Sequence, residues 1–381
     1  MTSTTADPAI ALLRELVAID SVNPSLVAGA AGEGAIGDAI GNYMRRAGLD
    51  VLVTEVVPGR SNVVGVLEGS QPGRALMLCG HMDTVGVEGM RAPFDPVERD
   101  GKLYGRGSQD MKGGLAAMID AARVARTRGF AKGRLIVAAV VDEEYASLGA
   151  DALAAAWRAE AAVVTEPTDL HIGVAHKGFA WAEVETRGRA AHGSRPREGR
   201  DAVLRMGRVL HQLEAMDRAL QARPAHALLG TASLHAPVIE GGREWSTYPD
   251  RCTLRLERRT IAGETGDTFM QEIDGLLEAL RAEDGEFDAS ARLTFARPSY
   301  EIPEGHPLPA ALARAGAEGG LTLHRVGMSF WTDAAILGSA GIPSVLFGPG
   351  GAGLHSAEEY VYVVDVIACR DALAALAMSY C

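Results

Sequence analysis

Short apolar runs alternate with segments of helical spacing over the first 170 residues, and this alternation constrains the fold most. Helical spacing covers residues 8–18, 34–47 and 112–128, and in the last of these Leu115, Met118 and Ile119 fall on one face. Runs typical of strands lie between the helices, at 50–56, 61–67, 75–79, 135–141 and 161–165. Such alternation predicts an α/β domain with a mixed sheet flanked by helices.

The order of elements changes near residue 177. Strand patterns near 180–186, 232–238, 252–257 and 291–295 surround helical patterns at 201–222 and 265–280. This βαββαβ order is typical of a ferredoxin-like unit. The α/β pattern then resumes, with a helix at 308–316 and an apolar strand at 344–347. We therefore expect a catalytic domain from residues 1–176 and 293–381, with residues 177–292 inserted as a second domain.

Composition excludes several classes of protein. The formal net charge of -12 argues against an extended nucleic-acid surface, which needs clustered Lys and Arg. No stretch approaches the roughly 20 apolar residues of a membrane span, and the N-terminus lacks the pattern of a signal peptide. The four cysteines form no CxxC pair, so we expect reduced thiols and a cytoplasmic protein. They are Cys79, Cys252, Cys369 and Cys381.

Side chains of the metal-binding type recur along the chain, each expected where a strand stops. They are His81, Asp83, Asp110, Glu143, Glu144, Glu166 and His355. The carboxyl ends of neighbouring strands in an α/β sheet converge on one edge, so these residues can meet in one crevice. Two imidazoles and several carboxylates suit zinc or a similar divalent cation.

The spacing within this set suggests a division of roles. Asp83, two residues past His81, is suited to accept a hydrogen bond from the ring nitrogen that does not bind metal. Adjacent side chains on a strand point in different directions, so of Glu143 and Glu144 one can bind metal while the other acts as a general base. Each piece alone also fits a surface position, and the signal lies in their joint occurrence.

Over nearly its full length the chain resembles the co-catalytic zinc amidohydrolases, a family that includes acetylornithine deacetylase, succinyl-diaminopimelate desuccinylase, aminoacylases and glutamate carboxypeptidase. The resemblance rests on motifs whose order and spacing are highly specific. They are GHMDTV at 80–85, LYGRGSQDMKGG at 103–114, DEE at 142–144, TEPT at 165–168, AHGS at 191–194, ERR at 257–259 and HSAEEYV at 355–361.

The resemblance implies a zinc-exopeptidase-like domain with two zinc ions per subunit, which cobalt or manganese can replace. Asp110 would bridge the ions, His81 and Glu166 would complete one site, and Glu144 and His355 would complete the other. Glu143 would be the general base, and Asp83 would orient His81. The inserted domain would act as a lid that forms a homodimer, and His192 would stabilise the oxyanion in the partner subunit's site. Arg259 would grip the substrate carboxylate.

Departures from the family pattern concern the substrate. Ser246 stands where the family usually has Asn, and the aromatic residues Phe330 and Trp331 stand where it commonly has glycines. Trp331 therefore either lines the substrate pocket or packs the core beside it. We expect the backbone of Gly350, in the loop at 348–351, to lie near the substrate. Arg259 has an alternative role as a surface ion-pair partner, because its strand is rich in charge.

The sequence thus predicts a metal-dependent hydrolase of an amide next to a free carboxylate, most simply one that deacylates an N-acyl amino acid. A dipeptidase or glutamate-type carboxypeptidase uses the same chemistry with a different substrate. An aminopeptidase fits less well, because Arg259 and His192 suit an anionic substrate end. A non-catalytic metal-binding scaffold would be expected to have a damaged ligand set.

Overall fold

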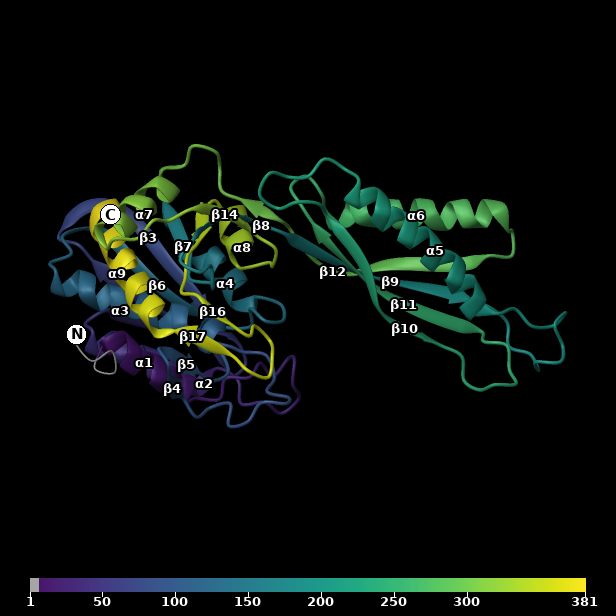
Figure 1. Ribbon diagram of the computed structural model, residues 1–381, viewed down its shortest axis with the longest axis horizontal. Coiled ribbons are helices and arrows are strands. Elements are labelled where there is room, and N and C mark those ends of the chain that lie inside the picture. Colours follow the sequence, from purple (N-terminus) through teal and green to yellow (C-terminus); the bar gives the residue numbers. More distant parts are fainter. Residues whose placement is uncertain (1–6) are drawn as a thin grey trace. The chain divides into compact units, whose positions relative to one another are not determined.

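Two compact units make up the computed structural model, which describes residues 7–381 (Figure 1). The first unit is formed by residues up to Val174, together with Ile302–Val326 and Thr332–Cys381. The second unit is formed by Ala175–Glu301 and Gly327–Trp331. The first unit contains two sheets and the second unit one, and each unit has its own hydrophobic core.

A mixed sheet forms the centre of the first unit. Its order is β1-β2-β6-β3-β7-β15-β8-β13, with β14 also paired to β8. Strands β6, β3, β7 and β15 run parallel to one another, so their carboxyl ends share one edge. The strands are β1 (Asp50–Val57), β2 (Arg60–Glu68), β3 (Gln71–His81), β6 (Lys132–Val140), β7 (Ala161–Val164), β8 (Ile172–His176), β13 (Tyr300–Glu301), β14 (Arg325–Met328) and β15 (Ser344–Leu346).

Helices flank this sheet, as the alternating pattern predicts. Helix α3 is central, because it contacts α1, α9 and strand β3, and α9 in turn contacts α7. Helices α4 and α8 contact each other elsewhere on the sheet. The helices are α1 (Pro8–Val17), α2 (Gly34–Arg46), α3 (Gly113–Thr127), α4 (Leu148–Ala156), α7 (Pro307–Glu318), α8 (Ala334–Ser339) and α9 (Val363–Tyr380).

A small second sheet brings two distant segments of the first unit together. Its order is β16-β17-β5-β4, and β17 pairs antiparallel with β5 through Tyr360 and Tyr104. The pairing places the segment that follows β5 beside the loop between β16 and β17. The strands are β4 (Val97–Arg99), β5 (Lys102–Tyr104), β16 (Gly351–Ala352) and β17 (Tyr360–Tyr362).

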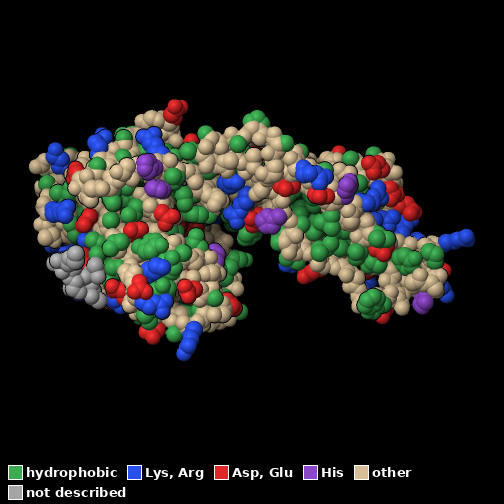
Figure 2. Space-filling model, viewed as in Figure 1, with side chains coloured by type: hydrophobic (Ala, Val, Ile, Leu, Met, Phe, Trp, Pro, Cys, Tyr) green, Lys and Arg blue, Asp and Glu red, His purple; other side chains and the backbone are tan. Residues whose placement is uncertain are grey.

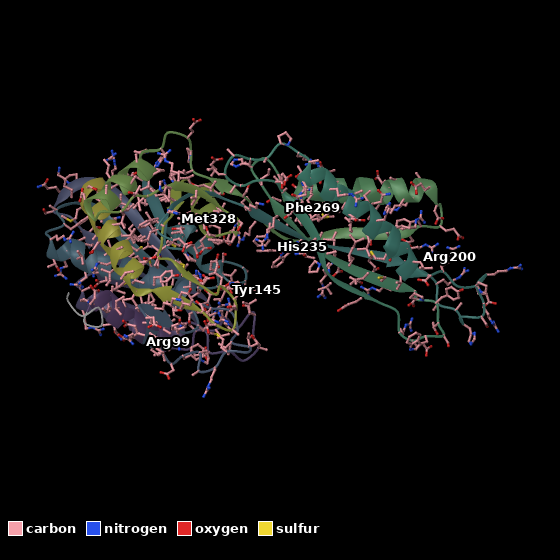
Figure 3. The ribbon with its side chains drawn as sticks, in the orientation of Figure 1. Arg99, Tyr145, Arg200, His235, Phe269 and Met328 are labelled. Atoms are coloured by element: carbon pink, nitrogen blue, oxygen red, sulfur yellow. The ribbon has the colours of Figure 1, made fainter. Side chains whose placement is uncertain are left out.

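The second unit has the order strand, helix, strand, strand, helix, strand. Its sheet is antiparallel in the order β10-β11-β9-β12, and α5 and α6 pack against it. Residues of β9 alternate, so that Ala180, Ala182 and Val184 join the core, whereas Trp181 is exposed. Phe269 of α6 is also in this core (Figure 3). The elements are β9 (Gly178–Arg187), α5 (Ala202–Gln221), β10 (Ser233–Gly241), β11 (Arg251–Thr260), α6 (Gly266–Glu283) and β12 (Asp288–Arg297).

Lys and Arg side chains are interspersed with Asp and Glu on the face shown in Figure 2. Among residues 7–381, no helix has the length and apolarity needed to cross a membrane. All four cysteines are free.

Candidate metal centre

Two of the predicted metal ligands lie at the ends of neighbouring parallel strands. His81 is the last residue of β3, and Glu166 follows β7 by two residues. The register pairs Cys79 with Val164, so both side chains emerge at the same edge of the sheet. His81 and Glu166 are both buried, with 1% and 4% of their surface exposed. For this pair, the predicted convergence of strand ends is confirmed.

The other carboxylates reach the same edge from turns, which corrects the expectation that every ligand stands where a strand stops. Asp110 lies in the single π-helical turn Ser108–Lys112, immediately before α3, where its own backbone angles are non-helical and the peptide bond to Met111 is cis. Strand β6 ends at Val140, so Glu143 and Glu144 belong to the turn that follows it. Their side chains therefore diverge because of the turn and not because of strand alternation.

A glycine allows the helix that follows Asp110 to lie very close to the segment that carries Glu166. A Cβ atom on Gly114 would come within 1.9 Å of the backbone oxygen of Thr165. Only a residue without a side chain fits this contact. The separation between the Asp110 and Glu166 segments thus depends on the glycine.

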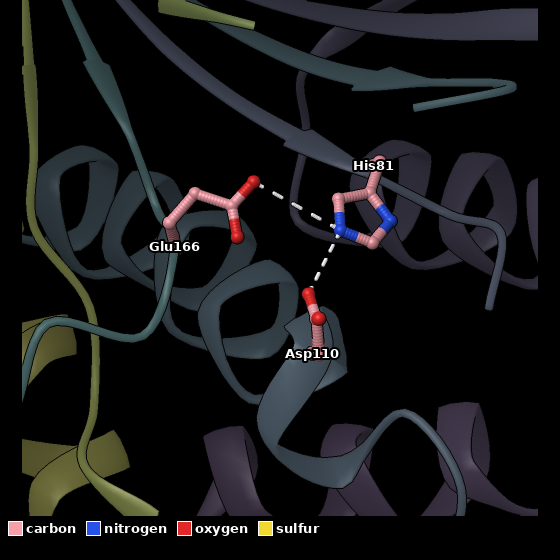
Figure 4. Close-up of side chains that lie close together, drawn as sticks. All are labelled: His81, Asp110 and Glu166. Carbon is pink, nitrogen blue, oxygen red and sulfur yellow. Dashed lines mark hydrogen bonds and ion pairs between the residues drawn. The ribbon is translucent and has the colours of Figure 1, made fainter. Parts of the chain in front are cut away.

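His81, Asp110 and Glu166 form the first ligand group (Figure 4). Nε2 of His81 lies 3.1 Å from Oδ1 of Asp110 and 3.9 Å from Oε1 of Glu166. The other ring nitrogen of His81, Nδ1, is 2.9 Å from the backbone oxygen of Asp83. This contact favours a proton on Nδ1 and leaves the lone pair of Nε2 directed at the carboxylates.

Asp110 also belongs to a second group, formed with Glu144 and His355. Nε2 of His355 lies 3.4 Å from Oδ2 of Asp110 and 3.2 Å from Oε2 of Glu144. The two oxygens of Asp110 therefore face different imidazoles. This arrangement suits a carboxylate that bridges two cations.

Burial and crowding of carboxylates perturb the titration of the whole cluster. Burial, with a smaller contribution from the nearby Asp110, raises the pKa of Glu144 to about 7, although the hydrogen bond to His355 opposes the shift. Burial also raises the pKa values of Glu143 and Glu166 well above the usual range. Hydrogen bonds to Asp110 and Glu144 raise the pKa of His355 to about 10. Burial therefore disfavours the charged form of all three glutamates, and a divalent cation at this place would relieve that cost.

The residues present fit divalent cations. The two groups share Asp110, and each supplies one imidazole nitrogen and carboxylate oxygens that lie within 4.8 Å of one another. Oε1 of Glu144 is buried and has no hydrogen-bond partner among residues 7–381. An unpaired buried carboxylate oxygen is costly unless a cation compensates it. Nitrogen and oxygen donors of this kind bind zinc, cobalt or manganese.

Asp83 has a different contact from the one predicted. Its backbone oxygen, not its carboxylate, is the hydrogen-bond partner of the His81 ring, and Oδ1 lies 3.6 Å from Nδ1. The carboxylate instead accepts hydrogen bonds from the backbone N–H groups of Glu143 at 3.2 Å and Glu144 at 3.1 Å. Asn23 donates to the same carboxylate at 2.7 Å. Asp83 thus fixes the turn that carries both glutamates.

A buried ion-pair network supports this turn from the other side. Arg60 donates to Oδ1 of Asp142 at 2.8 Å and also pairs with Glu33. Asn23 links Asp142 to Asp83, because its Nδ2 lies 3.1 Å from Asp142 and also contacts Asp83. Sequence reasoning assigned no role to Asn23, Glu33 or Arg60. They show no metal-type spacing, and only their burial reveals the connection.

His192 and Ser246 belong to the second unit and lie in adjacent loops. The N–H of Gly193 donates to the backbone oxygen of Ser246 at 2.7 Å. Nδ1 of His192 lies 2.8 Å from the hydroxyl of Ser194, and the side chains of His192 and Ser246 are exposed. The two residues are therefore brought together, although neither lies in the unit that contains the metal ligands.

The two adjacent arginines of β11 point to opposite sides of the sheet, as strand geometry predicts. Arg258 is buried and pairs with Glu264 and Glu272. Arg259 is partly exposed, donates to Oε1 of Glu257 at 2.6 Å and lies over the ring of Phe179. The side chain of Arg258 thus points into the interior of its unit. Arg259 faces outward and has only one ion-pair partner among the described residues.

Trp331 and Gly350 are both engaged in packing contacts. Trp331 is buried in the second unit, where its indole N–H donates to the backbone oxygen of Pro298 at 3.1 Å and its ring meets His176 and Phe179 edge-on. These contacts support the packing alternative for Trp331. The N–H of Gly350 donates to Asp365 at 3.1 Å, so this amide is already used within the first unit.

Comparison with known proteins gives consistent matches. Residues 77–379 match the model of peptidase family M20/M25/M40. The chain is 32% identical over 334 residues to an acetylornithine deacetylase of Myxococcus xanthus, covering 84% of each chain. It is 28% identical over 375 residues to an N-formyl-4-amino-5-aminomethyl-2-methylpyrimidine deformylase of Bacillus subtilis, covering 90% of this chain and 88% of the relative.

Solved structures share the fold at low identity. An aminopeptidase from Bacillus cereus superposes with a TM-score of 0.80 at 20% identity, covering 97% of each chain. A dinuclear metal-binding peptidase of family M20 from Bacillus subtilis superposes with a TM-score of 0.75 at 18% identity, covering 97% of this chain and 96% of the other. The mixed sheet with flanking helices is therefore the fold of this group.

Proposed function

Because the chain belongs to peptidase family M20/M25/M40, we propose that it is a two-metal hydrolase that deacylates an N-acyl amino acid. The observation that carries the proposal is the position of Asp110, whose two oxygens face the two ligand groups. The named relatives include a deacetylase and a deformylase, and both names describe removal of an acyl group from nitrogen. We propose zinc as the metal, with cobalt or manganese as substitutes.

Each side chain has a distinct task in this proposal. His81, Asp110 and Glu166 would hold one cation, and Asp110, Glu144 and His355 would hold the other. Divalent cations at these positions would supply electrophilic activation of the amide carbonyl and of water. Glu143, whose Oε2 lies 4.0 Å from Nε2 of His81, takes a proton from the attacking water and delivers it to the leaving amine.

Glu143→Ala tests this assignment. We expect metal content to stay near two ions per chain and turnover to be lost, because Glu143 carries the proton but is not among the ligands. Elemental analysis and an assay of N-acyl amino acid cleavage measure the two properties separately. Glu143→Gln, which keeps the shape of the side chain, should be equally inactive. Substantial turnover by either variant would contradict the role.

A substrate panel distinguishes the deacylase from its alternatives. N-acetyl amino acids should be cleaved in preference to dipeptides, and a dipeptidase or glutamate-type carboxypeptidase would show the opposite order. Cleavage of peptides that have a free N-terminus and a blocked C-terminus would indicate an aminopeptidase. Metal binding without cleavage of any of these substrates would support a non-catalytic scaffold.

Arg259 is proposed to bind the carboxylate of the substrate. Replacing Arg259 with Met should raise KM about tenfold to 100-fold for carboxylate substrates, as expected for loss of a charged hydrogen bond. Lys should not restore binding, because it lacks the planar fork of a guanidinium. Arg258→Met is the matched control, since it should lower stability through loss of its buried pairs with Glu264 and Glu272. Equal KM values for the Arg259 variant and wild type would contradict the role.

We also propose a cytoplasmic homodimer in which His192 serves the partner subunit's site. The supports are the family resemblance and the four free cysteines. If the proposal holds, mixing inactive His192→Ala and Glu143→Ala chains restores about one quarter of the activity, because half of the dimers are mixed and each has one complete site. Sedimentation should show a dimer. An active monomer, or no recovery on mixing, would overturn the role of His192 in the partner's site.

A further inference from the structure

The loop that carries His355 is exposed, and its last residue anchors it. The loop connects β16 to β17, and residues 354–358 are all exposed, whereas Glu359 is only 1% exposed. His355 has a φ of 57° and a side chain that is 56% exposed. The ligand therefore stands on a surface loop, unlike His81, which is buried at the end of a central strand.

Glu359 accepts four hydrogen bonds from the segment that contains Asp110. Oε1 accepts the backbone N–H groups of Gln109 at 2.9 Å and Asp110 at 3.1 Å. Oε2 accepts the N–H of Gly107 at 2.9 Å and Nη1 of Arg106 at 2.7 Å. One buried carboxylate thus fixes the backbone of the shared ligand, Asp110, from within the loop of His355.

Arg106 completes this connection. It is 3% exposed, and its Nη2 donates to the backbone oxygen of Ser356 at 3.0 Å, next to His355. Its Nε donates to the backbone oxygen of Gly86 at 3.0 Å, in the segment that follows His81 and Asp83. The guanidinium therefore ties the Asp110 segment, which carries it, to the two other segments, and its fork geometry allows these contacts at once.

We infer that Glu359 and Arg106 are positioning residues that hold His355 against Asp110 and thereby set the affinity of the second metal position. Their hydrogen bonds go to backbone groups and to each other, and among the described residues none goes to a side-chain atom of the two ligand groups. The first position depends on them less, because His81 and Glu166 are held by β3 and the end of β7. The inference rests on the proposed two-metal function, but it concerns metal affinity and not substrate choice.

Glu359→Gln tests the inference with little change in shape. The amide keeps one oxygen and places an N–H₂ group against backbone N–H donors, so about half of the four bonds are lost. We expect the second zinc ion to bind about tenfold to 100-fold more weakly, as is typical when a group that orients a metal ligand is removed. The first ion should be weakened less than the second, because it shares Asp110 but keeps His81 and Glu166, which the sheet holds. Zinc competition titrations with a coloured chelator, together with elemental analysis after dialysis, measure both affinities.

Glu358→Gln is the matched control. It removes the same charge one residue away, and the side chain of Glu358 is exposed. Both zinc affinities should stay at wild-type values. Equal weakening of both ions by Glu359→Gln, no weakening, or the same effect from Glu358→Gln would overturn the inference. A protein that binds two ions but cleaves no N-acyl amino acid would refute the proposed substrate and leave this inference standing.

Double variants identify which position is affected. If Glu359 acts through His355, adding Glu359→Gln to His355→Ala should cause little further loss of zinc affinity. The Glu166→Ala variant lacks a ligand of the first position. Adding Glu359→Gln to that variant should still weaken binding of the second zinc ion by the same factor as in wild type. Additive losses in the His355→Ala background would contradict action through His355.

Arg106→Lys provides an independent variant in case Glu359→Gln fails to fold. It preserves the charge but cannot reproduce the bonds to Gly86, Ser356 and Glu359 together. We expect the same selective weakening of the second zinc ion. If both variants are unfolded, or if Arg106→Lys weakens both ions equally, the pair serves the fold in general and the inference is wrong.

Discussion

At the scale of single residues, burial changes the chemistry of His176. Its ring packs near Tyr300 and Trp331 with centroid distances of 5.9 and 6.2 Å, and Nδ1 lies 2.9 Å from the backbone oxygen of Lys177. Burial lowers its pKa to about 4. The residue lies in the second unit and outside both ligand groups, in agreement with a structural role.

This shift makes the stability of the second unit depend on pH. His176 gains a proton below about pH 6.5 in the unfolded chain but only below about pH 4 in the folded chain. The unfolded state therefore binds more protons between these values, and stability falls as the pH decreases. Between pH 7.5 and pH 5, protonation of His176 in the unfolded chain should lower the free energy of unfolding by roughly 2 kcal/mol. Chemical denaturation of wild type and His176→Phe at both pH values isolates this contribution, and identical pH dependence would contradict it.

The residues of the two candidate ligand groups were predictable from the sequence because their type and order are specific. The residues that we infer to position them were not, because an Arg or Glu in a sequence is normally exposed. Arg106 and Glu359 both stand inside motifs that carry the family resemblance, yet only their burial reveals their contacts. The acceptor for His81 was misassigned to the Asp83 side chain because spacing does not distinguish a carboxylate from the backbone oxygen of the same residue.

At the scale of elements, the turn that bears Glu143 and Glu144 depends on Arg60 of β2. Arg60, Glu33 and Asp142 form a buried network, and Arg60 is the cation between the two carboxylates. Arg60→Met would leave the two buried carboxylates of Glu33 and Asp142 without their cation. We expect a loss of about 3–5 kcal/mol in the free energy of unfolding. Denaturant titration measures it.

The matched comparison is Arg134→Met. Arg134 of β6 pairs with Glu68 of β2, but both side chains are about half exposed, at 49% and 48%. Exposed pairs contribute at most about 1 kcal/mol. Similar losses for the two variants would show that the buried network is not specifically required for stability.

Elements were predictable in proportion to their length and regularity. Strands β6, β3 and β7 are apolar runs, and their parallel order gave the convergence of His81 and Glu166. Strands β4, β5, β16 and β17 have two or three residues each and no readable periodicity. Their sheet brings the His355 loop to Asp110, so the position of His355 beside Asp110 could be seen only in the structure.

At the scale of the whole molecule, the chain has two units with separate cores. All residues of the two ligand groups belong to the first unit. We therefore expect calorimetry to show two unfolding transitions, one for each unit. When a chelator removes the metal, only the transition of the first unit should move to lower temperature. Binding to the folded state alone raises stability, by about 2.7 kcal/mol when free metal is 100 times Kd.

Two observations would contradict this expectation. A single transition, or an equal shift of both, would show that the two units unfold cooperatively. The His355→Ala variant serves as a control, because it lacks one ligand and should show a smaller chelator-dependent shift. Restoring zinc should return the first transition of wild type to its original temperature.

Gly114 gives the centre an unusual vulnerability. A methyl group at this position would collide with the backbone of Thr165, so Gly114→Ala must move α3 or the Glu166 segment. The change alters no charge and removes no donor atom. It would nevertheless push apart the two segments that carry Asp110 and Glu166. An engineer who wished to change the span of this centre could therefore begin at Gly114, a position that contributes no side chain to it.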